Sequence, residues 1–416
     1  MGKYEIKGGI RLQGKIRAES AKNSVLPMLT ACLLTKDTVT IKNCPDISDV
    51  TVMLEIIRSL GGTTEINGKN VSVRFEKVKS NYVKEELSEK LRASIFFLGA
   101  LIPRTGGATV CSPGGCRIGK RPVDVHIEGL RALGVNVRER EDGKISATGC
   151  LKGNDVRLSF PSVSATENLL MCACLAKGRT VLKNCAREPE VRDFAEFLNS
   201  MGAKIYGAGK STVIIDGVKE LHGTEYLPTS DRIEVGTYLV ATAMTGGEIE
   251  IENASCENIF PLINKLCNNT CNLKIKNDII YYKSGGRFSS MKISTGPFPE
   301  FPTDLQAQIS ALCCIAEGRS YVSENVFENR FLHLTEMKKM GAKISIVGRT
   351  AVIDGTPSLC GAEVFANDLR GGAGLCLCAL SAEGKSVVHG TEFVRRGYAD
   401  FVNKLKSLGA DVSEKD

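Results

Sequence analysis

One sequence pattern recurs six times along this chain of 416 residues, and it constrains the fold more than any other feature. Each copy is an amphipathic segment that ends in Leu-Gly or Met-Gly, or a weaker equivalent, and leads into a strand-like run. The segments end at Leu60, Leu133, Met201, Cys267, Met340 and Leu408. They are 73, 68, 66, 73 and 68 residues apart, so each junction of the first half returns 207 residues later. The chain therefore consists of six repeats in two matched halves.

Each repeat also contains an earlier helix, a Gly- or Asp-bearing turn and a strand. Examples are the segments 31–40, 174–181 and 315–322. A repeat thus has the order strand, helix, strand, helix, strand over about 70 residues. A solenoid would stack such repeats without a period of three, so the spacing favours two closed α/β domains of three repeats each. A cleft between two such domains is a natural site for a small molecule.

The charge composition indicates which kinds of ligand this chain binds. Lys and Arg (54) exceed Asp and Glu (47), for a net charge of +7 that is spread along the chain. The basic blocks with interleaved aromatic residues that indicate nucleic-acid binding do not occur. Small, highly anionic ligands fit this charge balance better.

Cysteine usage and hydropathy predict a protein of the reduced cytoplasm. The sixteen cysteines include pairs within Leu/Ala-rich helical stretches, such as Cys313 and Cys314, where cysteine acts as a small hydrophobic residue. The four histidines have no metal-ligand spacing, so we expect no metal. The start of the chain lacks the apolar region of a signal peptide. No apolar run approaches the ~18 residues of a membrane span, so we expect no membrane association.

The segment 112–122, with sequence SPGGCRIGKRP, is the strongest candidate for a reactive loop. Arg117 and Lys120 favour the thiolate of Cys116, and the glycines and prolines indicate a loop that exposes it. The spacing of Gly114, Gly119 and Lys120 also matches a nucleotide-binding P-loop. That loop requires Ser or Thr next, whereas this chain has arginine and then proline, so the P-loop interpretation is disfavoured.

Other candidates have two interpretations each. Lys22, at the start of an apolar helix, could bind an anion together with the helix amides, or could be a solvated lysine beside a serine N-cap. Asp304 could be a general base or a favourable acid in a first helical turn. Arg92, Arg370 and Arg396 could be surface charges, or could converge on one anion from equivalent turns.

Taken together, these segments resemble the UDP-N-acetylglucosamine 1-carboxyvinyltransferase family, enolpyruvyl transferases of the EPSP synthase superfamily. The resemblance covers the chain from Gly14 to Leu408. Its markers are Ser20–Asn23, Leu91–Ser94, Pro113–Cys116 with Gly119–His126, Ala186–Glu190, Asp231–Thr237, Phe301–Gln308, Phe327–Phe331, Asp368–Arg370 and Arg396–Tyr398.

The resemblance implies a fold of two inside-out α/β domains, each of three βαβαββ repeats (the enolpyruvyl transferase fold). It places residues 22–229 in a first domain that carries the Cys116 loop as a lid. Residues 1–21 and 230–416 would form the second domain, with the active site in the cleft between them. A chain crossing of this kind is not visible in the sequence itself.

The implied reaction moves the enolpyruvyl group of phosphoenolpyruvate to the 3′-hydroxyl of UDP-N-acetylglucosamine and releases phosphate, by addition and elimination. Asp304 would accept the hydroxyl proton and Cys116 would protonate C3 of phosphoenolpyruvate. Lys22, Arg121 and Arg396 would bind phosphoenolpyruvate, supported by Asp368 and Arg370.

Contacts with the UDP-sugar are implied for Asn23, Arg92, Arg121, Pro122, Val123, Asp124, Val125, Ser162, Val163, Ser164, Ala165, Asp304 and Val326. The resemblance implies no metal, no organic cofactor and no obligate protein partner.

The chain departs from the family pattern at three places. Ser164 stands where the family more often has glycine, the run Gly371–Gly374 is unusually glycine-rich and is expected to loosen its turn, and residues 268–271 match poorly. Two alternatives remain: a sister enolpyruvyl transferase acting on shikimate 3-phosphate, or a silent UDP-sugar-binding homologue. The lid cysteine argues against the first, and the intact acid–base pair argues against the second.

Overall fold

The computed structural model describes residues 2–111, 123–267 and 271–415. Contacts divide them into two compact bodies. We call residues 20–111 and 123–229 the N-lobe, and residues 2–19 and 230–415 the C-lobe. None of the helices in these described ranges is long and apolar enough to cross a membrane.

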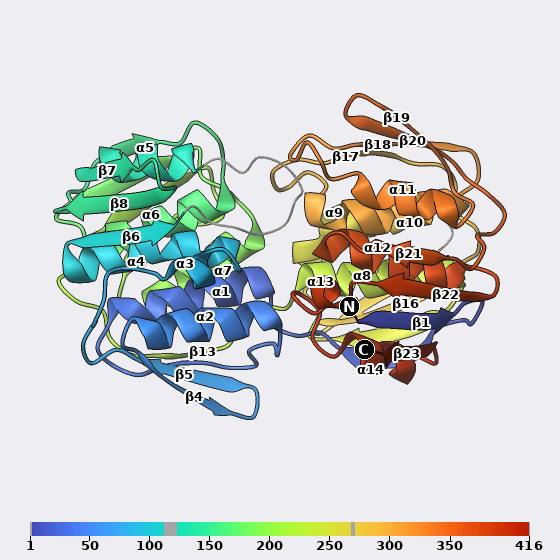
Figure 1. Cartoon of the computed structure of the whole chain (residues 1–416), viewed down its shortest axis with the longest axis horizontal. Coiled ribbons are helices and arrows are strands. Elements are labelled where there is room, and N and C mark those ends of the chain that lie inside the picture. The colour runs from blue at the N-terminus through green and yellow to red at the C-terminus, as the bar shows by residue number, and fades with distance from the viewer. Residues whose placement is uncertain (1, 112–122, 268–270, 416) are drawn as a thin grey trace. The chain divides into compact units, whose positions relative to one another are not determined.

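The N-lobe combines helices with short strands (Figure 1). Its helices are α1 (Lys22–Ala31), α2 (Ser48–Ser59), α3 (Glu85–Ser88), α4 (Phe96–Thr105), α5 (Asp124–Ala132), α6 (Val163–Cys174) and α7 (Pro189–Ser200), with 3₁₀ turns η1 (Cys32–Leu34) and η2 (Arg92–Ile95). Its strands are β3 (Val39–Ile41), β4 (Thr63–Asn67), β5 (Asn70–Arg74), β6 (Gly107–Cys111), β7 (Val135–Glu139), β8 (Lys144–Gly149), β9 (Asp155–Arg157), β10 (Arg179–Lys183), β11 (Lys204–Tyr206), β12 (Thr212–Asp216) and β13 (Glu225–Tyr226).

The C-lobe has the same kind of composition. Its helices are α8 (Arg232–Thr245), α9 (Cys256–Cys267), α10 (Gln306–Ile315), α11 (Leu332–Lys339), α12 (Leu369–Ser381), α13 (Thr391–Val394) and α14 (Phe401–Ser407), with the 3₁₀ turn η3 (Thr303–Leu305). Its strands are β1 (Lys3–Lys7), β2 (Gln13–Arg17), β14 (Glu248–Glu252), β15 (Cys271–Lys276), β16 (Ile279–Ser284), β17 (Lys292–Ser294), β18 (Arg319–Ser323), β19 (Lys343–Val347), β20 (Thr350–Asp354), β21 (Glu363–Phe365), β22 (Lys385–His389) and β23 (Asp411–Lys415).

Five of the six sheets share one order of four strands, and the sixth has the same order with three strands, which confirms the repeated α/β fold. In the fifth repeat the order is β17-β18-β20-β19, with β17 and β18 parallel and the other pairs antiparallel. The corresponding sheets are β13-β3-β5-β4, β9-β10-β12-β11, β2-β14-β16-β15 and β21-β22-β1-β23, while the second repeat forms β6-β8-β7. Five repeats are therefore βαβαββ, with one strand more than the sequence pattern alone indicated, and the second repeat has three strands in its sheet.

Three strands complete sheets whose other members lie far away in the sequence. β2 pairs with β14, β1 pairs with β22 and β23, and β13 pairs with β3. The chain consequently passes from the C-lobe to the N-lobe after Glu19 and returns after Thr229.

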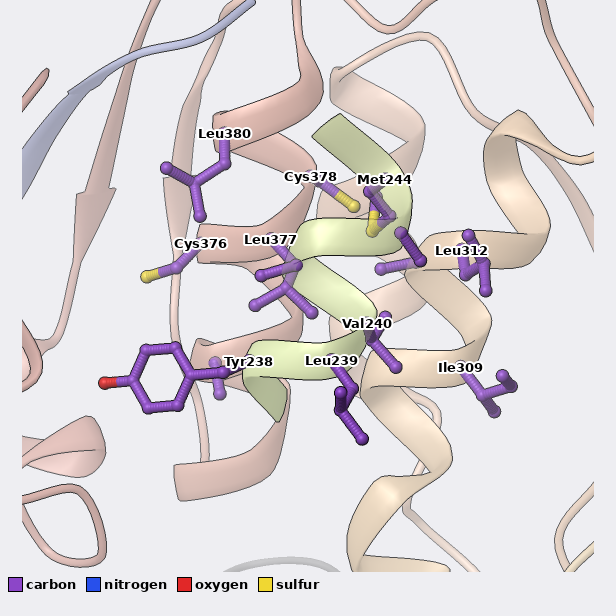
Figure 2. Close-up of a cluster of buried hydrophobic side chains, with 14 of the residues drawn as sticks. Tyr238, Leu239, Val240, Met244, Ile309, Leu312, Cys376, Leu377, Cys378 and Leu380 are labelled. Atoms are coloured by element: carbon purple, nitrogen blue, oxygen red, sulfur yellow. The ribbon is translucent and has the colours of Figure 1, made fainter. Parts of the chain in front are cut away.

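Each lobe is inside out because its innermost layer is helical. In the C-lobe, nearly every residue of α8, α10 and α12 is buried, as expected of helices that are hydrophobic on all sides. Figure 2 shows Leu239, Leu312 and Leu377 from these three helices packed together. In the N-lobe, α1, α4 and α6 are buried to a similar extent. The paired cysteines of these helices are fully buried, which confirms their role as small hydrophobic residues.

The repeated Leu-Gly and Met-Gly junctions have a backbone cause. Gly61, Gly134, Gly202, Gly341 and Gly409 have φ between 87° and 101°. This left-handed conformation at a helix end strongly favours glycine, so each junction ends a helix and turns the chain into the next strand.

The glycines after Arg370 serve close packing, so the expectation that they loosen a turn is wrong. They lie inside α12, and all of them are buried. A Cβ atom on Gly371 would meet Asp368 Oδ2 at 2.6 Å, and one on Gly374 would meet the backbone oxygen of Ala307 at 3.0 Å. Glycine is needed there because α12 packs closely against its neighbours.

Candidate active site

Lys22 stands at the start of α1, where its ammonium group is paired within the N-lobe. Its Nζ lies 2.5 Å from Asp49 Oδ2, and the side chain is 12% exposed. The N-cap is Ala21 without a side-chain cap, and the hydroxyl of Ser20 lies 3.4 Å from the carbonyl oxygen of Pro228. The alternative of a serine N-cap with a solvated lysine is therefore wrong. The ion pair with Asp49 thus holds the ammonium group of Lys22 in place at the start of α1.

Asp304 lies in η3, directly before α10, and two arginines of the C-lobe hold its carboxylate. Arg330 Nη2 donates to Oδ1 at 2.7 Å, and Arg370 Nη2 donates to Oδ2 at 3.2 Å. Both guanidinium side chains are 4% exposed, whereas the carboxylate side chain is 27% exposed. The carboxylate is therefore the part of this cluster that solvent reaches.

The arginines decide the charge of Asp304. Burial alone would raise its pKa, but Arg370, Arg330 and more weakly Arg232 hold it well below its usual value. Burial conversely opposes the charge on Arg370, and the carboxylate of Asp304 holds the pKa of that arginine above its usual value. The cluster is thus an ionised carboxylate at neutral pH, held from two sides by cations.

A second carboxylate fixes the loop that carries Arg330. Thr303 Oγ1 accepts a 2.9 Å hydrogen bond from Arg330 Nη1 and donates one of 2.9 Å to Glu324 Oε2. The other oxygen of Glu324 accepts from the amides of Val326 at 2.9 Å and Phe327 at 3.1 Å. These bonds tie the loop after β18 to η3, so Arg330 is preorganised beside Asp304.

Asp368 caps α12, the helix that carries Arg370, and so supports the same cluster. It is the N-cap of α12, and its Oδ1 accepts from the amides of Arg370 at 3.0 Å and Gly371 at 2.9 Å. His333 lies buried nearby, and burial lowers its pKa to about 4, with Asp368 opposing and Arg330 adding to the effect. A neutral imidazole therefore stands beside this cluster at physiological pH.

Several polar side chains lie close together at the start of α6 in the N-lobe. Ser162 is its N-cap and accepts from the amide of Ala165 at 3.3 Å. The hydroxyl of Ser164 lies 3.1 Å from His126 Nε2, and His126 Nδ1 lies 2.9 Å from Asn168 Nδ2. First-turn amides and a hydroxyl together form a donor-rich surface, which suits phosphate or carbonyl oxygens.

The remaining predicted residues lie as follows. Asn23 is on α1, Arg92 on η2, Val123–Val125 at the start of α5, Val163 on α6, Val326 in the loop after β18, and Arg396 in the turn after α13. Val125 and Ala165 are both buried, and the amide of Ala165 donates to the cap of α6. Cys116, Arg121 and Pro122 lie outside the described residues.

The structure thus brings together Asp304, Arg370 and Asp368 among the predicted residues of the C-lobe. It adds Arg330, which lies within the family marker Phe327–Phe331 but was not among the predicted site residues. Arg330 lies in the strand-to-helix loop of the fifth repeat, the same loop that carries Arg396 in the sixth. Comparison of equivalent loops between repeats could have found it. Within the described ranges, no group of three or more potential metal ligands occurs.

Comparison with protein families gives one match to nearly the whole chain. The model of the EPSP synthase (3-phosphoshikimate 1-carboxyvinyltransferase) family matches residues 6–405.

Full-length relatives carry a more specific name. UDP-N-acetylglucosamine 1-carboxyvinyltransferase 2 of Caldanaerobacter subterraneus subsp. tengcongensis is 47% identical over 414 residues, which are 99% of each chain. UDP-N-acetylglucosamine 1-carboxyvinyltransferase of Coxiella burnetii is 45% identical over 416 residues, covering 99% of this chain and 96% of the relative.

Solved structures agree on the fold. The enolpyruvyl transferase NikO from Streptomyces tendae has a TM-score of 0.90 at 25% identity, covering 100% of this chain and 99% of that one. EPSP synthase from Acinetobacter baumannii has a TM-score of 0.74 at 20% identity, with complete coverage of both chains. That likeness concerns the fold alone.

Proposed function

This chain belongs to the EPSP synthase family, and from that membership we propose that it transfers the enolpyruvyl group of phosphoenolpyruvate to the 3′-hydroxyl of UDP-N-acetylglucosamine. The UDP-sugar is proposed as the acceptor because the chain is 43–47% identical, along its whole length, to relatives named for this UDP-sugar. We further propose a cytoplasmic role in the first committed step of peptidoglycan synthesis, without a metal or organic cofactor and without an obligate protein partner.

In this proposal, Asp304 takes the proton of the sugar hydroxyl as that oxygen attacks C2 of phosphoenolpyruvate. The thiol of Cys116 gives its proton to C3, which completes a tetrahedral adduct. In the elimination step the thiolate of Cys116 takes a proton back from C3, the double bond between C2 and C3 forms again, and phosphate leaves with the electron pair of the C2–O bond that breaks. The exposure of the Asp304 carboxylate supports its contact with a substrate.

The strong ion pairing of Asp304 sets a condition on this role. A carboxylate held by Arg330 and Arg370 is a weak base, because both cations stabilise its ionised form. Proton transfer therefore has to occur while negative charge develops on the substrates. Lys22, Arg121 and Arg396 are proposed to bind that charge.

The proposed domains are residues 22–229 and residues 1–21 with 230–416, with the substrates bound in a cleft between them and the Cys116 loop as the lid. Closure over the substrates would exclude water from the adduct. Contacts of the UDP-sugar with the residues predicted from the family resemblance belong to the same proposal.

Phosphate release tests the proposal directly. The purified protein is incubated with phosphoenolpyruvate and either UDP-N-acetylglucosamine or shikimate 3-phosphate. We expect phosphate with the UDP-sugar and none with shikimate 3-phosphate. Release with shikimate 3-phosphate would establish the sister reaction, and no turnover with either acceptor would favour a silent binding protein.

A further inference from the structure

Three side chains of the N-lobe form a hydrogen-bonded relay that ends at the start of α6. Asn168 and Ser164 are both on α6, and His126 is on the neighbouring helix α5. His126 is 2% exposed and Asn168 is fully buried, whereas Ser164 is partly exposed. The relay thus runs from the interior of the lobe to its surface.

The donor and acceptor of each hydrogen bond in the relay follow from the bond between Asn168 and the backbone of Ile95. Asn168 Nδ2 lies 3.0 Å from the carbonyl oxygen of Ile95, which can only accept, so this atom is the amide nitrogen. The same nitrogen lies 2.9 Å from His126 Nδ1, which must therefore accept. In a neutral imidazole the proton then resides on Nε2.

The imidazole is neutral over the physiological range. Burial, with a contribution from the charge of Arg92, lowers the pKa of His126 to about 3. Nε2 consequently donates to Ser164 Oγ at 3.1 Å. Since Oγ accepts this bond, the hydroxyl proton of Ser164 points to another acceptor, and no described residue provides one.

We propose that Asn168 and His126 are positioning residues that orient the Ser164 hydroxyl to donate a hydrogen bond to the nucleotide half of the UDP-sugar. This inference rests on the proposed function. The acceptor would be a diphosphate or uracil carbonyl oxygen, because the first-turn amides of α6 present donors beside this hydroxyl.

Steady-state kinetics of Ser164→Ala and Ser164→Gly test this proposal. Loss of one hydrogen bond to the ligand should raise the KM for UDP-N-acetylglucosamine about five- to tenfold, with a smaller change in kcat and in the KM for phosphoenolpyruvate. Ser159→Ala is the matched control, because that hydroxyl is bound to Glu128 on the exposed surface at 3.0 Å. It should leave all three constants unchanged. Equal UDP-sugar constants in Ser164→Ala and the unmodified protein would overturn the proposal.

Competition by fragments of the nucleotide identifies the acceptor. If the hydroxyl binds the diphosphate, Ser164→Ala weakens inhibition by UDP but not by uridine. If it binds uracil, both inhibitors weaken by the same factor. Weakened inhibition by a phosphoenolpyruvate analogue alone would contradict the assignment to the nucleotide.

The relay itself can be observed without substrate. The chain has four histidines, so ¹⁵N-histidine labelling gives a simple NMR spectrum. We expect one imidazole, absent in His126→Gln, to carry its proton on Nε2 and not to titrate between pH 5 and 8. Its Nε2 resonance should shift in Ser164→Ala. A proton on Nδ1 would overturn the relay, whereas absence of turnover in the unmodified protein would contradict only the proposed function.

Discussion

At the scale of single residues, Asp304 shows how neighbouring charges set the ionisation state of a side chain. Its sequence context allowed either a general base or a favourable helix-start acid. The structure adds Arg330 at 2.7 Å and Arg370 at 3.2 Å, which keep the carboxylate ionised. Burial of two guanidinium groups has a desolvation cost, which their pairing with the carboxylate of Asp304 offsets.

Replacing Asp304 by Asn should lower kcat at least about 100-fold, because the proton acceptor is lost. The pKa of Asp304 is lower in the folded protein than in the unfolded chain, so its contribution to stability is complete above the unfolded pKa of about 4 and is lost as pH falls through the folded pKa. The stability difference between the unmodified protein and Asp304→Asn should therefore be constant from pH 5 to 8 and shrink below about pH 4.

The matched control is Asp354→Asn, which removes a carboxylate bound at 2.6 Å by Arg319 on the exposed surface. It should change kcat and unfolding little. Urea denaturation at several pH values and phosphate release measure both variants. An active Asp304→Asn enzyme would exclude Asp304 as the base.

Cys116 gives a second prediction at this scale. Fosfomycin, an epoxide that mimics phosphoenolpyruvate, should alkylate Cys116, because Arg117 and Lys120 favour its thiolate. Peptide mass spectrometry locates the adduct, and Cys116→Asp should abolish both labelling and inhibition. Cys150 and Cys360 are exposed and serve as internal controls within the same protein. Preferential labelling of either would contradict the assignment.

At the scale of elements, the three innermost helices of the C-lobe are joined by polar groups as well as by apolar packing. Tyr398 donates to Thr237 Oγ1 on α8 at 2.8 Å and accepts from Gln308 Nε2 on α10 at 3.0 Å. Thr237 Oγ1 itself donates to the carbonyl oxygen of Ile233 at 2.8 Å, which fixes these directions. The guanidinium carbon of Arg370 lies 5.6 Å from the centre of the Tyr398 ring.

Removal of that hydroxyl should therefore destabilise the protein. Tyr398→Phe keeps the ring but leaves a buried amide of Gln308 with one partner fewer, at a cost of about 1–2 kcal/mol in the free energy of unfolding. Tyr238→Phe is the matched control. Tyr238 is equally buried and also packs on Phe401, but its hydroxyl has no hydrogen-bond partner among the described residues. Equal stabilities of the two variants in urea denaturation would contradict the role of this network.

At the scale of the whole molecule, the position of the first nineteen residues has the largest consequence. β1 lies inside the sheet β21-β22-β1-β23, and its Tyr4 and Ile6 are 1% and 0% exposed. Without β1, β23 loses the strand with which it pairs, and the core loses the buried side chains of Tyr4 and Ile6.

We therefore expect a fragment of residues 20–229 to fold alone and a fragment of residues 230–416 to remain unfolded. A peptide of residues 1–19 added in trans should restore cooperative unfolding of the second fragment, as followed by circular dichroism. Cooperative unfolding of residues 230–416 without the peptide would show that β1 and β2 are dispensable.

The repeat, the α/β class and the positions of the helix-ending glycines could be predicted from the sequence, because these depend on local periodicity and on backbone conformations that few residues other than glycine adopt. The sequence also provided the family resemblance and, with it, Asp304 and Arg370. The sequence did not show that β1, β2 and β13 complete distant sheets, that Asp49 pairs with Lys22, or that Arg330 binds Asp304. Those contacts join residues remote in sequence, and no local pattern encodes which charge will meet which once the core has packed.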